Sequence, residues 1–289
     1  MSNEISRRNL LARAGMTLAG AMTLGTLSAC GEDTKKTETD TTPVDPGPQV
    51  ADFPYEQHLP SAYQLDAAAV REAAYHGYYA GGCCHGAYSA LLGHLADTAG
   101  KPFSLMPKDF GKFGGGGIAS YGSICGAALG GTLIINSIVA NADARNAMMT
   151  ELLRWYEGYA FPAYVPTTVD AAETGTTKNF TAAGIVQLQR APNSHLCHAS
   201  VSDWCAANGV SAGGADKKAR CARLTADVAG KVAEMLNTYL AGTGAWTAPA
   251  RDAQSATCVT CHPATSTVQP VASGMKCGTC HADKTTGHP

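Results

Sequence analysis

DAAAVREAAYHGYYAGGCCHGAYSALL, residues 66–92, is the stretch that decides the fold. It is rich in alanine, and its aromatic side chains recur at helical spacing, as at Tyr75, Tyr78 and Tyr79. The spacing predicts a helix over 65–96. Glycine is a poor residue for a helix interior, so the Gly-Gly pair at 81–82 predicts an interruption or kink, followed by a second helix through 84–92.

The sequence around this stretch predicts further helices and no strands. Phe113 is followed by four glycines, which lose too much backbone entropy for a helix interior, so 113–117 should be a loop. Residues 118–140 are uncharged and long enough for a membrane span, but their Gly, Ser and Asn content favours a buried central helix. Apolar spacing predicts amphipathic helices over 145–161 and 217–240. The expected fold class is all-α, with little regular structure after residue 241.

Composition limits the class of protein. With 289 residues, 45% of them hydrophobic, the chain can bury one ordinary core, with or without a small appendage. The formal net charge of -2 excludes the basic surface that nucleic acid demands. The 11 cysteines are not spread as in a disulfide scaffold, because four lie in two C-terminal motifs.

The N-terminus has the pattern of an export signal. Arg7 and Arg8 precede an apolar stretch over 14–27, as in twin-arginine signals. Small residues before Cys30 resemble a bacterial lipobox, in which Cys30 is lipidated and anchors the protein; the alternative is a plain signal peptide with an incidental cysteine. We therefore expect export to the periplasm or outer surface as a membrane-anchored lipoprotein.

Four segments follow from these patterns. Residues 1–30 are the signal with its lipobox, and 31–50, rich in Thr, Asp and Pro, should be a flexible tether. Residues 51–241 form the helical domain that contains six cysteines, and 242–289 form a segment with few large apolar side chains.

The C-terminal segment contains Cys-x-x-Cys-His twice. In this motif two cysteines form thioethers to a haem and the histidine binds its iron. The six residues are Cys258, Cys261, His262, Cys277, Cys280 and His281. Only 14 residues separate the motifs, so two covalent haems c should lie close together and exchange electrons rapidly.

A zinc ribbon is the alternative for these four cysteines, because two Cys-x-x-Cys pairs at this spacing also bind zinc. A four-cysteine zinc site does not need a histidine after each pair, however, and both His262 and His281 stand there. Haem is therefore favoured.

Each haem iron needs a sixth ligand or an open position. Among the other histidines, three lie beside cysteines in apolar contexts and are the candidate distal ligands, in the order His85, His198, His195. Met275 and Met106 are weaker candidates. Because the twin-arginine pathway exports folded proteins, a metal cluster on the body cysteines is expected to assemble before export; rapid folding without a cluster is the alternative.

The body resembles the C-GCAxxG-C-C family of helical redox-type domains. The matching elements are the Gly82–Ala87 stretch, the glycine run at 113–117, Cys125 to Gly131, Cys197 and Cys221. The central motif differs in reading Cys-Gly-Ala. With two haem motifs appended, nearly all of the mature chain resembles the split-Soret cytochromes c.

This resemblance implies a homodimer with two haems per subunit, ligated by two histidines each, one of which can come from the partner subunit. It also implies an iron-sulfur centre in the body. The cysteines assigned by the resemblance are Cys84, Cys125, Cys197 and Cys221, with Cys83 and Cys205 able to replace Cys84 or Cys197; structural disulfides are the alternative.

Three functions compete at this point. The first is electron transfer between periplasmic redox proteins through a close haem pair and a body iron-sulfur cluster, without enzyme activity. The second is a haem enzyme with one open iron position for a small ligand. The third is a redox or structural lipoprotein with a zinc ribbon.

Overall fold

The computed structural model of the protein describes residues 52–284. The expected export signal, Cys30 and the tether lie outside the described residues, as does His288. The α-helices are α2 (Ala67–Ala99), α3 (Gly126–Ile138), α4 (Ala142–Gly158), α5 (Ala182–Ile185), α6 (Cys197–Asn208), α7 (Ala215–Leu240) and α8 (Ala253–Cys261). Short 3-10 helices are η1 (Glu56–His58), η2 (Phe103–Leu105), η3 (Lys108–Gly114), η4 (Val186–Leu188), η5 (Cys277–Thr279) and η6 (Ala282–Lys284).

The all-α fold class is confirmed. In residues 52–284, β pairing is limited to two isolated bridges, Ile124 with Leu196 and Phe161 with Arg190. The helices predicted over 145–161 and 217–240 correspond to α4 and α7 within a few residues.

Helix α2 begins and bends where the sequence predicts. The Asp66 side chain accepts hydrogen bonds from the backbone N–H groups of Ala68 and Ala69, which caps the first turn. Gly82 interrupts the helix with φ 84° and ψ 178°, a conformation that L side chains rarely adopt. The predicted kink is therefore confirmed, and the second half of α2 takes its own direction.

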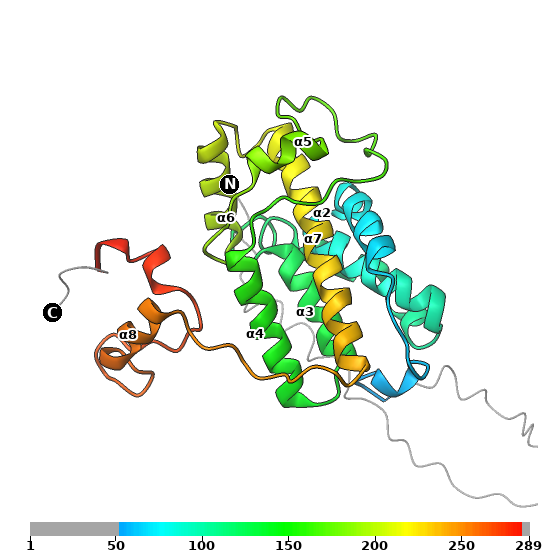
Figure 1. The fold of residues 1–289 in the computed structure, drawn as a ribbon, viewed down its shortest axis with the longest axis horizontal. Helices are drawn as coiled ribbons and strands as arrows, with labels where there is room; N and C mark the ends of the chain where they lie inside the picture. The colour runs from blue at the N-terminus through cyan, green and yellow to red at the C-terminus, as the bar shows by residue number, and fades with distance from the viewer. Residues whose placement is uncertain (1–51, 285–289) are drawn as a thin grey trace, which may run out of the picture. The chain divides into compact units, whose positions relative to one another are not determined.

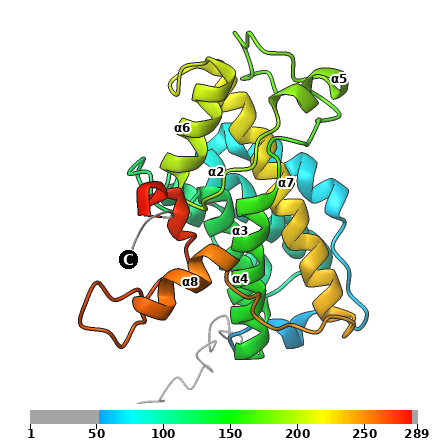
Figure 2. The ribbon, with the colours of Figure 1, turned by 60° about the vertical axis from the view of Figure 1, so that its left-hand side comes forward.

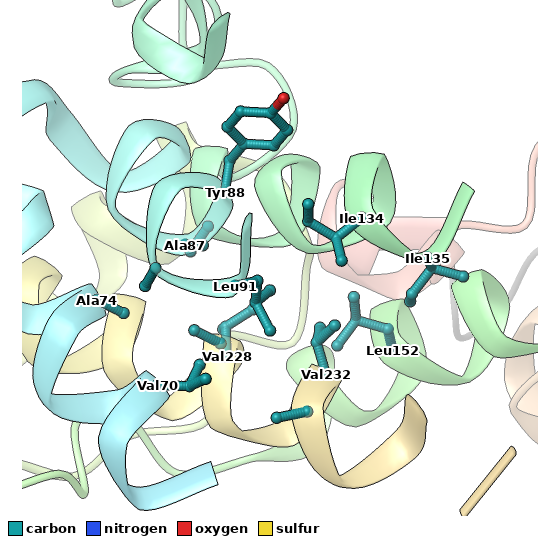
Figure 3. Close-up of a cluster of buried hydrophobic side chains, with 14 of the residues drawn as sticks. Val70, Ala74, Ala87, Tyr88, Leu91, Ile134, Ile135, Leu152, Val228 and Val232 are labelled. Atoms are coloured by element: carbon teal, nitrogen blue, oxygen red, sulfur yellow. The ribbon is translucent and has the colours of Figure 1, made fainter. Parts of the chain in front are cut away.

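The core lies where α2, α3, α4 and α7 meet (Figure 3). Leu91, Ile134, Leu152 and Val232, one from each helix, are fully buried. Each such side chain stabilises the fold by about 1.5–3 kcal/mol relative to an exposed one. In Figure 1, α7 runs beside both α2 and α4, and its contacts with α2 are the most extensive between any two elements of the described chain. Helix α7 thus packs against each of the other three core helices.

Helix α3 approaches α2 through a glycine face. A Cβ atom on Gly130 would lie 2.6 Å from the carbonyl oxygen of Cys84, and one on Gly126 would lie 2.5 Å from the Sγ of Cys83. Real Cβ atoms essentially never come so close. The absence of side chains at these two positions lets the backbones of α2 and α3 pack at short range.

The stretch 118–140 differs from its prediction as one helix. It begins as a loop, and the helical part starts only at Gly126. Backbone hydrogen bonds hold the loop to the start of α6: Cys197 N donates to Ser123 O, and Cys125 N donates to His195 O. These tertiary bonds compete with helix formation before Gly126. No helix of the described residues is long and apolar enough to cross a membrane.

The C-terminal segment contains the short helix α8, which the sequence did not predict. Of residues 242–284, only Ser255 is buried. Figure 2 shows α8 crossing in front of α4, and Asp252 at its N-cap lies 3.9 Å from Arg154 of α4. Few side chains of the segment therefore take part in a core.

The glycine face gives a test with an internal control. We expect Gly130→Ala to destabilise the protein by about 1–3 kcal/mol, because the new methyl group would overlap the Cys84 carbonyl. Gly158→Ala, at the end of α4 with no atom within 4 Å of its Cβ position, should be neutral or stabilising. The free energy of unfolding from denaturant titration measures both; equal effects would contradict the packing role.

A buried carboxyl group should make stability depend on pH. Burial raises the pKa of Asp227 from 3.8 to about 7, although Ala163 N donates a hydrogen bond to it. Folding therefore favours the protonated carboxyl group. Its contribution to the free energy of unfolding is complete below about pH 4 and is lost as the pH rises to about 7. The difference of about three between the unfolded and folded pKa values corresponds to at most about 4 kcal/mol. Asp227→Asn should flatten the stability between pH 4 and 7, measured by thermal unfolding; an unchanged slope would contradict this.

Candidate functional site

Four cysteines from separate segments lie near one another inside the body. Cys83 lies on α2 just after the kink, Cys125 precedes α3, Cys197 begins α6 and Cys221 lies on α7. The side chains of Cys83 and Cys125 share a hydrogen bond, and Cys125 interacts electrostatically with Cys197 and Cys221. We call these four residues the thiol cluster.

Backbone N–H groups point at the thiol cluster. The sulfur of Cys83 accepts from the N–H groups of Gly116 and Cys84. Its bond to Cys125 and its burial together raise the pKa of Cys83, whereas the same bond lowers the pKa of Cys125. N–H donors toward a sulfur stabilise a thiolate or metal-bound sulfur over a neutral thiol.

The loop that supplies Gly116 has an unusual backbone. Residues 116–120 all have positive φ, including Ile118 at 52°, a β-branched residue for which this conformation is a genuine outlier. Strain of this kind persists only where surrounding contacts enforce it, and it is concentrated at functional sites. Here it brings Gly117 against the Cβ of Cys197.

Cys84 and Cys205 occupy other places. The Sγ of Cys84 lies against Gly114, and burial raises the pKa of Cys84 to about 12. Cys205 is buried in a small second core with Phe180 and Trp204. The preference for Cys84 as a ligand therefore changes: the geometry favours Cys83, because it is the one of the two adjacent cysteines that bonds to Cys125.

Polar side chains close one side of the thiol cluster. Tyr156 of α4 is fully buried, donates its hydroxyl proton to the Ser200 oxygen at 3.0 Å, and interacts with the sulfur of Cys125. Arg220 donates to that same Ser200 oxygen at 2.8 Å. Its other terminal nitrogen lies 3.9 Å from the sulfur of Cys221.

The donor set suits a soft metal such as iron, since thiolates are the ligands of iron-sulfur centres. Within residues 52–284 no group of three or more His, Cys, Asp or Glu side chains lies in a geometry ready to hold a metal ion. Binding by all four thiolates would thus involve rotation of their side chains. All ten described cysteines are free thiols.

The two C-terminal motifs lie side by side. Cys258 and Cys261 are on α8, His262 ends that helix, and the second motif forms η5. The side chains of Cys258 and Cys277 share a hydrogen bond. The expected proximity of the two attachment sites is therefore present in the fold, while Cys261 and Cys280 face solvent.

The second motif is fastened to the body at one loop. Thr279 donates through its hydroxyl to the carbonyl oxygen of Asn193 at 2.6 Å. A cavity of about 680 Å³ opens beside this contact, and both the body and the C-terminal segment line it, with Asn193, Ala199 and Ser202 facing Gln254, Gly278 and Thr279. Its volume is within the usual range of cofactor pockets, about 300–1,000 Å³. The cavity therefore lies between the body and the second motif, and polar side chains form most of its lining.

Two of the three candidate distal histidines flank this cavity in sequence. His195 follows Asn193 by two residues, and its Nδ1 lies 3.0 Å from the Oε1 of buried Glu157, which leaves Nε2 to bind a ligand. Metal-binding histidines are commonly oriented in this way. His198 precedes Ala199 and is exposed.

His85, the third candidate, lies elsewhere. It is 6% exposed and lines another cavity, of about 530 Å³, between α2 and residues 108–109. Its Nδ1 has no hydrogen-bond partner among the described residues, and burial lowers its pKa. No residue of 242–284 lines this cavity.

Comparison with known proteins identifies the family of this chain. Residues 81–235 match the family described as "Putative redox-active protein (C_GCAxxG_C_C)". The chain is 32% identical over 237 residues to split-Soret cytochrome c of Desulfovibrio desulfuricans, covering 78% of this chain and 81% of the relative. A solved structure of that cytochrome, described by its novel iron centre, superposes with a TM-score of 0.67 at 31% identity, covering 78% of this chain and 94% of the other.

Sequence reasoning missed the polar residues of the site, namely Tyr156, Glu157, Ser200 and Arg220. One signal was present. Arg220 stands four residues before Leu224, on the apolar stripe of the predicted helix over 217–240, where a charged side chain is out of place unless it has a buried partner.

Thiol exposure separates the two groups of cysteines. In the full chain produced without haem attachment, we expect Cys261 and Cys280 to be alkylated rapidly, because both are exposed. Cys84 should react slowly, since it is fully buried and burial raises its pKa to about 12. Mass spectrometry of timed iodoacetamide reactions measures this; fast labelling of Cys84 would contradict the described core.

Proposed function

Because this chain belongs to the C_GCAxxG_C_C family of redox-active proteins and is a relative of split-Soret cytochrome c, we propose that it is an electron-transfer protein with two covalent haems c and an iron centre in its helical body. Its relatives show that it is a redox protein that binds haem or iron. The positions of the cysteines and histidines support the two haems and the iron centre in the body.

The observation that carries the haem proposal is the adjacency of the two Cys-x-x-Cys-His motifs. Their first cysteines, Cys258 and Cys277, are in side-chain contact, and the second motif is fastened to the body at Thr279. His262 and His281 would be the proximal ligands. Bound haem supplies one-electron chemistry at iron, and the contact between the two motifs would hold the two groups close enough for electron exchange.

His195 is the distal ligand that the geometry supports best for the second haem. The Thr279–Asn193 bond brings the second motif to the loop that contains His195, and Glu157 fixes the ring through Nδ1. His198 is the next candidate. A haem at His85 would come from a second copy of the chain, because residues 242–284 do not reach that cavity; a homodimer would supply it.

The thiol cluster would hold the iron centre. Cys83, Cys125, Cys197 and Cys221 are proposed as its ligands, with N–H groups of Gly116 and Cys84 bonded to the Cys83 sulfur. An iron-sulfur cluster accounts for these four cysteines better than disulfides do. Metal-bound sulfur is stabilised by N–H donors, whereas a disulfide does not need them.

The site of action follows from the sequence alone. The twin-arginine pattern and Cys30 support export and attachment to a membrane surface by a lipid, where the partners would be periplasmic redox proteins. Export in a folded state would place assembly of the iron centre before export and haem attachment after it.

Adjacent cysteines provide a matched pair for the iron centre. Cys83→Ser should lose the non-haem iron, whereas Cys84→Ser should retain it, because only Cys83 bonds to Cys125. Iron and acid-labile sulfide, counted against haem in protein from a host that attaches haem c, are the measurement. Equal retention in both variants, or two haems and no other iron in the wild type, would remove the iron centre from the proposal.

Two nearby histidines provide a matched pair for the haem. His195→Ala should convert one of two haems from low spin to high spin and create a carbon monoxide site, and His198→Ala should not. Optical and electron paramagnetic resonance spectra report both. Strong carbon monoxide binding by the reduced wild type would instead favour a haem enzyme with an open iron position. Absence of covalent haem on a denaturing gel would favour the zinc ribbon.

A further inference from the structure

Arg220 carries a buried charge without a carboxylate partner. Its side chain is 1% exposed, and the hydrogen bonds of its guanidinium go to Ser200 at 2.8 Å and to the sulfur of Cys221 at 3.9 Å. Its Nε has no partner among the described residues. The nearby Asp227 interacts with it electrostatically but directs its Oδ2 to the Ala163 N–H instead.

Arg223, one turn further along α7, shows how a buried arginine is usually paired. It is also 1% exposed, but it forms a two-point ion pair with Glu173 at 2.6 and 2.8 Å. A buried guanidinium without such a partner is strongly unfavourable. The groups near Arg220 in place of a carboxylate are Cys221 and Cys125 of the thiol cluster and Tyr156, with which it interacts electrostatically. Burial raises the pKa of Asp227 to about 7, so below that pH its carboxyl group is protonated, and iron-bound sulfur is the group that would balance the charge of Arg220.

A polar network extends from Arg220 toward Cys125. Arg220 and Tyr156 both donate to the Ser200 hydroxyl, at 2.8 and 3.0 Å, and the Tyr156 hydroxyl also interacts with the sulfur of Cys125. Arg220 also reaches Cys221 directly. Two of the four proposed ligands are thus in contact with one cationic network.

We infer that Arg220, acting with Ser200 and Tyr156, is the counter-charge of the thiolate-bound iron centre and sets its reduction potential. The inference rests on the proposed function, because it requires iron at the thiol cluster. Reduction adds one electron, and hence one negative charge, to the four-thiolate site. A fixed positive charge and hydrogen bonds to sulfur stabilise that more negative state and raise the potential.

The direct test is a redox titration of the full haem-containing protein with dithionite, following the iron centre by electron paramagnetic resonance. Arg220→Met should lower its potential by at least 59 mV, a tenfold change in the equilibrium constant for one electron. Arg220→Lys, which keeps the charge, should shift it by less than half as much. An unchanged potential in Arg220→Met would overturn the inference.

Tyrosine variants add a second, milder test in case Arg220→Met does not fold. Tyr156→Phe should lower the potential because the polar hydroxyl group beside Cys125 is lost, while Tyr88→Phe, a buried control, should not. A structural role alone would reduce stability and leave the potential in place, which Arg223→Met is expected to show.

Stability gives an independent readout. With iron bound, Arg220→Met should lower the melting temperature, since it removes the counter-charge. After a chelator has removed the non-haem iron, the same substitution should raise it, because the unpaired charge is gone. The same sign in both states would contradict the inference. A wild type without non-haem iron would defeat the proposed iron centre itself, whereas iron with an unshifted potential would defeat only the role of Arg220.

Discussion

The close approach of α3 to the kinked α2 is the constraint on which the rest of the structure depends. At Gly126 there is no room for a side chain beside the Cys83 sulfur, so the two helices fix Cys83 and Cys125 relative to each other. Helix α7 then packs along α2 and brings Cys221, and the loop before α3 holds the start of α6, with Cys197, through backbone hydrogen bonds. The thiol cluster is therefore a product of helix packing.

Local pattern was sufficient for much of the fold. Periodic apolar residues located α4 and α7, and the Gly-Gly pair located the kink of α2, because these features depend on residues close in sequence. The haem motifs were also readable, since their chemistry lies within five consecutive residues. Prediction was less successful over 118–140. Hydrogen bonds with residues distant in sequence hold the first part of this stretch as a loop, so the helix begins only at Gly126.

The choice between Cys83 and Cys84 could not be made from sequence. Neighbours on a helix point about 100° apart, and which one meets Cys125 depends on the direction that the chain takes after Gly82. Arg220 presented a similar problem. Its place on an apolar stripe indicated a buried partner, but the partners come from α4 and α6, and no local rule brings them together.

The nearly coreless C-terminal segment has a consequence for how the protein is degraded. Of residues 242–284 only Ser255 is buried, so little apolar burial opposes the opening of this segment when haem is missing. A protease would cleave this segment first. The product would be the intact helical body with its cysteines, which ends near Leu240. A chain that fails to attach haem would thus lose its C-terminal segment to proteolysis and keep the helical body.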